Sequence, residues 1–214
     1  MERDFWEARW AAGQIGFHQG KPNRLLARHA DLLDGRRRIL VPLAGKAVDL
    51  RFLAARGHEV VGIELVRAAV EAFFEEQGIE ARATTLGPYQ GLTGGGVTLL
   101  VGDFFAATPE GIGRFDAIYD RAALVALPSE MRARYVPHGL GLLEEGGRVV
   151  LISFAYDQSK MEGPPFSVDD DEVRRLYAPH EVRIVEEREE PTAPHLAERG
   201  LTSLTERLYA IDIR

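Results

Sequence analysis

The sequence predicts an α/β protein with an open, doubly wound, mostly parallel β-sheet. Helices are expected on both faces, with an antiparallel hairpin near the C-terminus and a helical segment near the N-terminus. Three observations predict this class: short apolar runs alternate with segments of helical periodicity, glycines stand where those segments stop, and two strand-like runs follow each other late in the chain. Such alternation is typical of βαβ units, whose right-handed crossovers place helices on both sides of a parallel sheet.

Each element has a local signal. The continuous apolar run at residues 38–43 is typical of a buried strand, and Gly57 and Gly78 close the two helical segments that follow. Further strands are predicted at residues 59–64, 97–101, 115–119, 147–155, 182–187 and 204–213. Helices are predicted at residues 46–56, 67–77 and 129–143, with one or two more packed outside the sheet in the roughly 35 residues ahead of the first strand.

Three further runs of similar residues indicate local structure and no binding or catalytic role. The glycines at residues 94–96 come before a strand instead of after one, so we interpret them as a turn and not as a phosphate cradle. The acidic run at residues 169–172 is typical of a helix start, and the one at residues 186–190 of a solvated loop.

The composition excludes several classes of protein. The chain has no cysteine among its 214 residues, which rules out disulfide scaffolds, thiolate metal sites and a cysteine nucleophile. A net charge of −7 disfavours nucleic-acid binding, and no window approaches the roughly 18–20 apolar residues of a membrane helix. The six histidines lack metal-binding spacing. We expect residues 1–214 to form one cytoplasmic, monomeric domain without a signal peptide, a metal site or a membrane partner.

The turn after the first strand indicates the kind of ligand. Ligands of open parallel sheets bind beyond the carboxyl ends of the strands, near the point where the strand order reverses. The turn at residues 42–46 holds one glycine, Gly45, and not the three of a dinucleotide-binding fingerprint. A pyrophosphate needs several close backbone approaches, so this turn favours a ligand without phosphates. The alternative is an ordinary tight turn.

Acidic residues end the next two strands. Glu64 stands nineteen residues after Gly45, the spacing at which a carboxylate binds ribose hydroxyls; its alternative role is a solvated carboxylate that caps the following helix. Asp103 is followed by Phe104 and Phe105, which suit the edge and faces of an adenine, although the phenylalanines could equally belong to the core.

Asp120 and Arg121 end the fourth strand and point to the same crevice. For such a pair the alternative to a role in the site is a structural ion pair. Trp6 lies ahead of the sheet, four residues before Trp10, so the two rings share one face of a helix and form either a core-facing stripe or a lid over the site.

Six segments in this order resemble the thiopurine S-methyltransferase family. They are residues 6–10 (WEARW), 15–19 (IGFHQ), 41–46 (VPLAGK), 57–64 (GHEVVGIE), 119–126 (YDRAALVA) and 163–166 (GPPF). The resemblance extends from about residue 5 to residue 209. It implies a class I methyltransferase with a seven-stranded sheet and S-adenosyl-L-methionine as cofactor. It also implies methyl transfer to a small thiol such as a thiopurine, or to selenium or tellurium compounds.

The resemblance also implies site roles. For the cofactor the expected residues are Trp6, Leu43, Gly45, Glu64, Asp103, Phe104 and Arg121. For the substrate we expect contacts from Phe17, His18 and Pro165, with His195 or Arg199 as a second substrate-side residue. Arg121 and Asp120 are the expected catalytic pair: Arg121 would stabilise an anionic thiol substrate, and Asp120 would orient Arg121 or interact with the sulfonium charge.

Two other functions fit the same predicted fold. A nicotinamide-dependent dehydrogenase is disfavoured by the missing second and third glycines of the first turn. A non-catalytic nucleoside-binding module would bind the cofactor without transferring a methyl group. Because a thiolate is already nucleophilic at neutral pH, methyl transfer to it needs no obligatory base, so the lack of an evident nucleophile–base pair does not argue against an enzyme.

Overall fold

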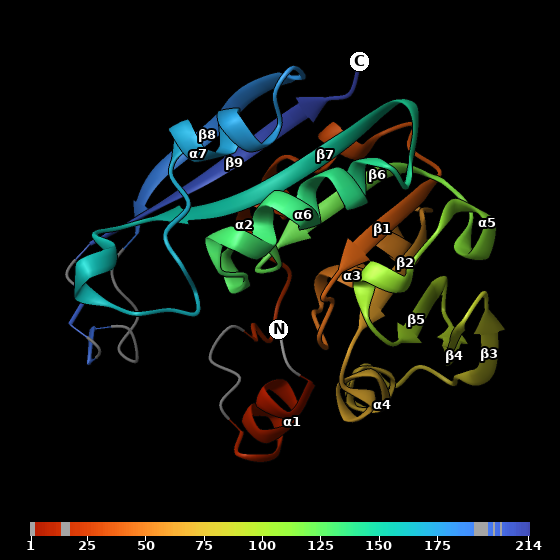
Figure 1. Cartoon of the computed structure of the whole chain (residues 1–214). Coiled ribbons are helices and arrows are strands. Elements are labelled where there is room, and N and C mark those ends of the chain that lie inside the picture. Colours follow the sequence, from red (N-terminus) through yellow and green to blue (C-terminus); the bar gives the residue numbers. More distant parts are fainter. Residues whose placement is uncertain (1–2, 14–17, 191–196, 199, 202) are drawn as a thin grey trace.

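A computed structural model describes the chain apart from residues 1–2, 14–17, 191–196, 199 and 202. Within the described residues nine strands form one sheet in the order β3-β4-β5-β2-β1-β6-β7-β9-β8 (Figure 1). The strands are β1 (Arg38–Pro42), β2 (Glu59–Glu64), β3 (Arg82–Leu86), β4 (Tyr89–Gly94), β5 (Val97–Val101), β6 (Phe115–Arg121), β7 (Leu143–Ala155), β8 (Glu181–Glu190) and β9 (Leu204–Asp212).

The centre of the sheet is parallel, as predicted. Strand β1 lies between β2 and β6, and β5 and β7 continue the parallel set on either side. These strands are apolar on both faces because each face is covered; Leu40 and Val61, for example, are almost fully buried. Since the chain moves outward from β1 in both directions, the strand order reverses there, and a crevice opens at the carboxyl ends of β1 and its neighbours.

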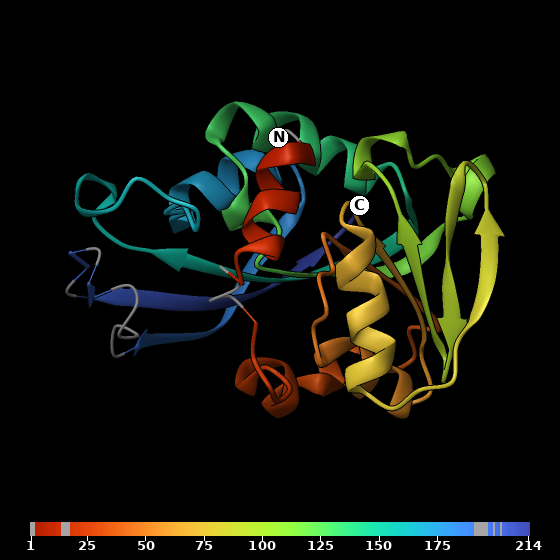
Figure 2. The same cartoon turned by 90° about the horizontal axis from the view of Figure 1, so that it is seen from below.

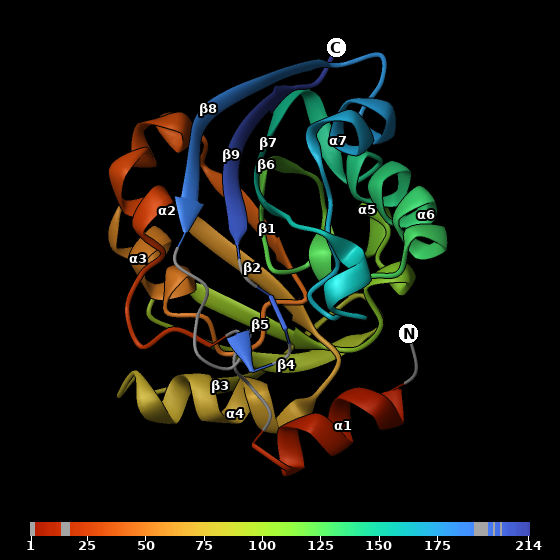
Figure 3. The same ribbon diagram turned by 90° about the vertical axis from the view of Figure 1, so that its left-hand side faces the viewer.

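Helices cover both faces (Figure 3). The α-helices are α1 (Arg3–Ala11), α2 (Arg24–Arg28), α3 (Asp49–Ala55), α4 (Arg67–Glu76), α5 (Pro109–Ile112), α6 (Ser129–Leu140) and α7 (Asp170–Leu176), with short 3-10 turns η1 (Ala30–Leu33), η2 (Phe104–Ala106), η3 (Leu124–Ala126) and η4 (Gln158–Lys160). One core cluster joins the sheet to α2, α3 and α4, and a second joins it to α5, α6 and α7. The predicted doubly wound class is therefore confirmed.

The predicted number of seven strands is wrong. Two additional strands, β3 and β4, form an antiparallel hairpin that pairs with β5 at one edge of the sheet. The segment lacks a long apolar run: β3 reads RATTL and is mostly exposed. Edge strands need little apolar sequence because only one side of them is packed, so the pattern that identifies central strands misses this hairpin.

The predicted C-terminal hairpin is confirmed, with one change of order. Strands β8 and β9 are antiparallel, and β9 lies between β7 and β8. Residues 186–190 were expected in a solvated loop and instead belong to β8. Cross-strand and tertiary partners explain this difference, since Glu187 pairs with Arg207 on β9 and Glu186 pairs with Arg28 on α2.

Strands β7 and β9 extend beyond the other parallel strands. Strand β6 ends at Arg121, opposite Ile152, while β7 continues for three more residues and stays paired with β9. Figure 1 shows β7 (teal) and β9 (blue) running past their neighbours. We call residues 153–155 and 204–207 the β7–β9 overhang.

The helix α1 packs differently from the others. None of its residues is buried, and it lies at the strand-end side of the molecule, next to α4 (Figures 2 and 3). Among the described residues, no helix is long and apolar enough to cross a membrane.

Candidate active site

A cavity of about 960 Å³ lies at the carboxyl ends of the parallel strands. Its wall follows the strand order across the sheet. Gly102, Asp103, Phe104 and Phe105 come after β5, Glu64 from β2, Leu43 and Gly45 after β1, Arg121 from β6, Phe154 from β7, and Leu204 and Glu206 from β9. The described part of the N-terminal segment contributes Trp6, Arg9 and Trp10.

The turn after β1 is compact because it rests directly on β2. Leu43 and Gly45 both have positive φ angles, 46° and 54°, and the Ala44 amide donates to the Ile63 carbonyl at 3.0 Å. A β-carbon at Gly62 would stand 2.9 Å from the Ala44 β-carbon and 2.4 Å from Leu99. Glycine at position 62 therefore allows the turn to sit close above the sheet.

Glu64 connects two turns through its carboxylate. Oε2 accepts from the Gly45 amide and Oε1 from the Val66 amide, each at 2.8 Å. The residue is 6% exposed, and burial raises the pKa of its carboxyl group, while the amide hydrogen bonds oppose that shift. The two oxygens of a carboxylate offer about four acceptor sites, so each oxygen keeps one for a ligand.

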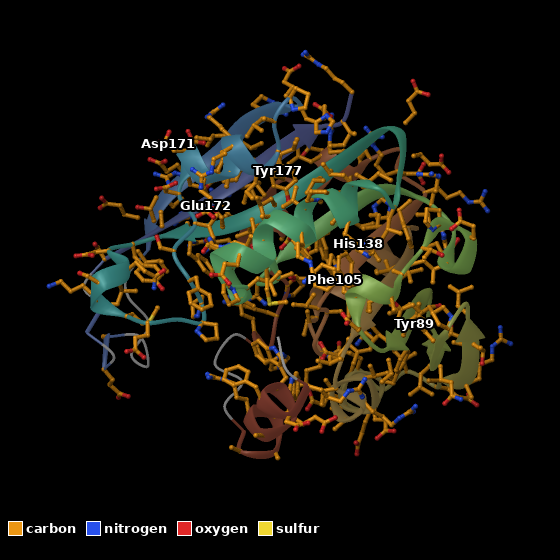
Figure 4. All side chains as sticks on the ribbon, viewed as in Figure 1. Tyr89, Phe105, His138, Asp171, Glu172 and Tyr177 are labelled. Carbon is orange, nitrogen blue, oxygen red and sulfur yellow. The ribbon has the colours of Figure 1, made fainter. Side chains whose placement is uncertain are left out.

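The segment after β5 is held by aromatic side chains (Figure 4). The Tyr89 hydroxyl donates to the Asp103 carbonyl at 2.7 Å, and the Asp103 side chain accepts from the Phe105 amide at 3.0 Å. Phe104 is buried against Tyr135 and His138, with ring centroids 5.1 Å apart in both cases. Phe104 is thus both a core residue and part of the cavity wall, a combination of the two roles that the sequence left open.

Arg121 stands at the middle of the cavity wall. Its Nε is buried and has no hydrogen-bond partner among the described residues. The next residue, Ala122, has a positive φ of 64°, so the chain turns sharply as β6 ends. Arg121 lines the cavity and forms no ion pair with Asp120, so the structural ion pair that the sequence left open as an alternative is absent.

The carboxylate of Asp120 is directed away from the cavity, because neighbouring residues of a strand face opposite sides. It is 1% exposed and accepts from the Tyr135 hydroxyl at 2.6 Å and from the Leu124 amide at 3.1 Å. Burial raises its pKa to about 6. The structure therefore contradicts the expectation that Asp120 orients Arg121: both carboxylate oxygens have other partners.

The predicted substrate-side residues have different positions. Pro165 lines the cavity. His18 is not among the lining residues; its Nε2 lies 4.0 Å from Glu76 on α4, and its pKa is lowered, mainly by burial. Phe17, His195 and Arg199 lie outside the described residues.

Two features were missed by the sequence analysis. Buried Asp49 accepts from the Asn23 amide at 2.6 Å and from the Tyr119 hydroxyl at 2.9 Å, which ties the cavity-lining segment before α2 to the sheet. Glu206 lines the cavity and is 8% exposed. Its signal in the sequence is a carboxylate between Leu204 and Leu208, on the otherwise apolar face of a strand. No cluster in the described part of the chain could hold a metal ion.

Comparison with solved structures matches this architecture to methyltransferases. A 1,6-didemethyltoxoflavin-N1-methyltransferase from Burkholderia thailandensis, with bound 1,6-didemethyltoxoflavin and S-adenosylhomocysteine, has a TM-score of 0.65 at 18% identity, over 99% of this chain and 87% of that one. A SAM-dependent methyltransferase from Anabaena variabilis has the same TM-score and identity over 99% and 95% of the two chains.

Comparison of sequences is more specific. The family model described as thiopurine S-methyltransferase matches residues 1–214. A thiopurine S-methyltransferase of Pseudomonas putida is 44% identical over 99% of both chains, and one of Azotobacter vinelandii is 43% identical over the full length of both. The chain therefore belongs to the thiopurine S-methyltransferase family and is a methyltransferase.

Proposed function

We propose that this chain transfers a methyl group from S-adenosyl-L-methionine to the sulfur of a small thiol such as a thiopurine, as a cytoplasmic monomer, and that selenium or tellurium compounds are further acceptors. One observation carries the proposal: buried Glu64 and the guanidinium of Arg121 line one cavity, on either side of the turn after β1. That arrangement offers a carboxylate for ribose and, on the other side of the same turn, a cation for an anionic acceptor.

The donor groups fit S-adenosylmethionine. Glu64 has one acceptor site left on each carboxylate oxygen, which suits two neighbouring ribose hydroxyls. Asp103 and Phe104 would border the adenine, and Leu43 and Gly45 the methionine part. The turn after β1 has no glycine-rich cradle for a pyrophosphate, which disfavours a dinucleotide. The S-adenosylhomocysteine in the Burkholderia structure supports the same assignment.

The residues of the chain bind the cofactor and the acceptor, orient them toward each other and exclude water from the cavity. The bound cofactor supplies a methyl group made electrophilic by its sulfonium. Arg121 lowers the energy of the anionic sulfur of the acceptor and holds it in line. Trp6 contributes to the cover over the cavity, and Pro165 to its acceptor-side wall. Asp120 acts as a positioning residue, since its carboxylate holds the turn that follows Arg121.

The test is thermal unfolding of the protein with S-adenosylmethionine, S-adenosylhomocysteine or NAD, followed by a methyl-transfer assay. A ligand at about 100 times its dissociation constant adds roughly 2.7 kcal/mol, which raises the midpoint by roughly 5–10 °C for a chain of this size. We expect the shift with the first two ligands and methylation of thiols in the assay.

The other outcomes contradict the proposal in distinct ways. A shift with NAD alone indicates a dehydrogenase. Binding of S-adenosylmethionine without transfer to any of a panel of thiols, selenols and tellurium compounds indicates a nucleoside-binding module.

A further inference from the structure

The loop that follows β7 supplies part of the cavity wall. Pro164 and Pro165 line the cavity, and the next residue, Phe166, donates from its amide to the Val125 carbonyl at 2.6 Å. Val125 belongs to η3, which follows Arg121 at the end of β6. The loop therefore belongs to the β6 and β7 side of the cavity, across β1 in the strand order from the ends of β2 and β5.

This part of the wall has few backbone donors. The two successive prolines have no N–H group, so their backbone can accept hydrogen bonds through its carbonyls but cannot donate any. The hydroxyl of Tyr156, the residue directly after β7, donates to the Pro165 carbonyl at 2.5 Å. The Tyr156 amide also donates to the Ser167 side chain at 3.0 Å. Tyr156 thus holds the loop both at the wall and just beyond it.

The ring and the hydroxyl of Tyr156 have separate contacts. The ring packs against an apolar cluster, and Tyr156 is not among the residues that line the cavity. The cluster consists of Met161, Leu201 and Leu204. The side-chain amide of Gln158 donates to the Tyr156 hydroxyl at 3.2 Å, so the hydroxyl accepts there and donates to the wall. Removal of the hydroxyl would leave the apolar packing in place and release one carbonyl of the wall.

Tyr89 has a similar arrangement on the other side of β1. Its hydroxyl donates to the Asp103 carbonyl at 2.7 Å, and its ring lies against Gly102, where a β-carbon would stand 2.7 Å from it. Gly102 and Asp103 line the cavity, and Tyr89 is not among the lining residues. Two phenols behind the cavity wall therefore each hold one carbonyl of a lining residue, on opposite sides of β1 in the strand order.

We propose that Tyr156 is a positioning residue for the methyl acceptor: its hydroxyl fixes Pro165 and thereby the apolar wall against which the acceptor ring lies. Tyr89 fixes the adenine side through Asp103 in the same way. This inference rests on the proposed function. Because the wall contacts the acceptor ring and not the methyl group in transfer, it stabilises the bound state and the transition state equally. Loss of the Tyr156 hydroxyl therefore raises the KM for the acceptor and leaves kcat unchanged.

The test compares Tyr156→Phe with its counterpart Tyr89→Phe. Kinetics with 6-mercaptopurine at saturating S-adenosylmethionine give kcat and the acceptor KM, and calorimetric titration with S-adenosylhomocysteine gives the affinity of the cofactor site. In Tyr156→Phe the acceptor KM rises about three- to tenfold, the range for one hydrogen bond, while kcat and the S-adenosylhomocysteine affinity stay within about twofold. In Tyr89→Phe the S-adenosylhomocysteine affinity falls about three- to tenfold, and the acceptor KM stays within about twofold.

A double-mutant cycle with Pro165→Ala tests whether Tyr156 acts through Pro165. Residues that act through the same contact give effects that are not additive, whereas independent residues give effects that add. The increase in acceptor KM caused by Tyr156→Phe should therefore be clearly smaller in the Pro165→Ala protein than in the wild type.

Three results overturn the inference: an unchanged acceptor KM in Tyr156→Phe, an equal weakening of acceptor and S-adenosylhomocysteine in that variant, or the full increase in KM in the Pro165→Ala protein. Unfolding midpoints check that the variants fold. Failure of the proposed function is distinguishable from these results, because it is seen in the wild type as a lack of methylation of any thiol.

Discussion

The carboxylate of Glu64 has two roles, one in the fold and one in the site. It holds the Gly45 and Val66 amides, and it retains acceptor sites toward the cavity. Burial raises its pKa, so the charged form owes its stability to those amides and, in the complex, to the ligand's hydroxyls. The residue is therefore both part of the fold and part of the site.

Glu64→Ala should weaken S-adenosylmethionine binding by about 1.5–3 kcal/mol, the range for hydrogen bonds to a charged group. Calorimetric titration measures this change. Glu59→Ala is the control, because Glu59 is an exposed carboxylate at the opposite end of the same strand. An affinity in Glu64→Ala equal to that of the control would remove Glu64 from the ribose site.

At the scale of residues, the sequence predicts those parts of the site that follow strand ends. Leu43, Glu64, Asp103 and Arg121 stand directly at or after a parallel strand, so local periodicity locates them. Glu206 could not be located in this way, since its place in the cavity depends on the register between β7 and β9. The direction of the Asp120 side chain likewise depends on which face of β6 its neighbours occupy.

The turn formed by η3 depends on one buried carboxyl group. Asp120 accepts from the Leu124 amide and from Tyr135 on α6, and the phenol of Tyr177 also faces it. Burial raises its pKa from 3.8 to about 6. The folded protein therefore holds this proton more tightly than the unfolded chain does.

The free energy of unfolding should consequently decrease as the pH rises from about 4 to about 6, because only the unfolded chain releases this proton readily there. A shift of about two pKa units corresponds to roughly 2–3 kcal/mol. In Asp120→Asn that part of the decrease should be absent, so the variant gains stability relative to wild type over this window. Urea unfolding at a series of pH values measures it. Parallel curves for the two proteins would contradict the assignment.

At the scale of elements, central strands and edge strands differ in how well a sequence predicts them. Strands β1 and β2 are buried on both faces and read as continuous apolar runs. The hairpin of β3 and β4 is held by backbone pairing at the edge, which leaves little trace in side-chain pattern. Strand β8 carries so many acidic residues that its end resembles a loop, and its pairing with β9 becomes visible only in three dimensions.

The whole molecule consists of a packed body and a cover, α1, that has no buried residue. Two core clusters bind the sheet to its helices, whereas α1 has no buried residue and contributes Trp6, Arg9 and Trp10 to the cavity wall. The alternation of strands and helices predicts the body, because the body is built from local units. It does not predict the position of α1, because that position depends on contacts between segments that are distant in the sequence.

Deletion of residues 1–13 should accordingly leave the unfolding midpoint within about 2 °C of wild type, since little apolar surface is lost from the core. The same deletion should weaken acceptor binding by about tenfold, or about 1.4 kcal/mol, through loss of the aromatic cover. Thermal unfolding and steady-state kinetics measure the two effects. A large fall in the midpoint would mean that α1 belongs to the body.

The link that Glu64 makes between Gly45 and Val66 has a consequence for the entropy of association. Before any ligand arrives, the turn after β1 and the start of α4 are already fixed to each other. Few backbone torsions remain to be frozen when a nucleoside binds, so little of the interaction energy is spent on ordering the protein. The cofactor therefore binds to a preorganised surface. The acceptor side of the cavity is lined by other elements, the β7–β9 overhang and the loop with Pro164 and Pro165, so it can change between related enzymes while the cofactor side stays the same.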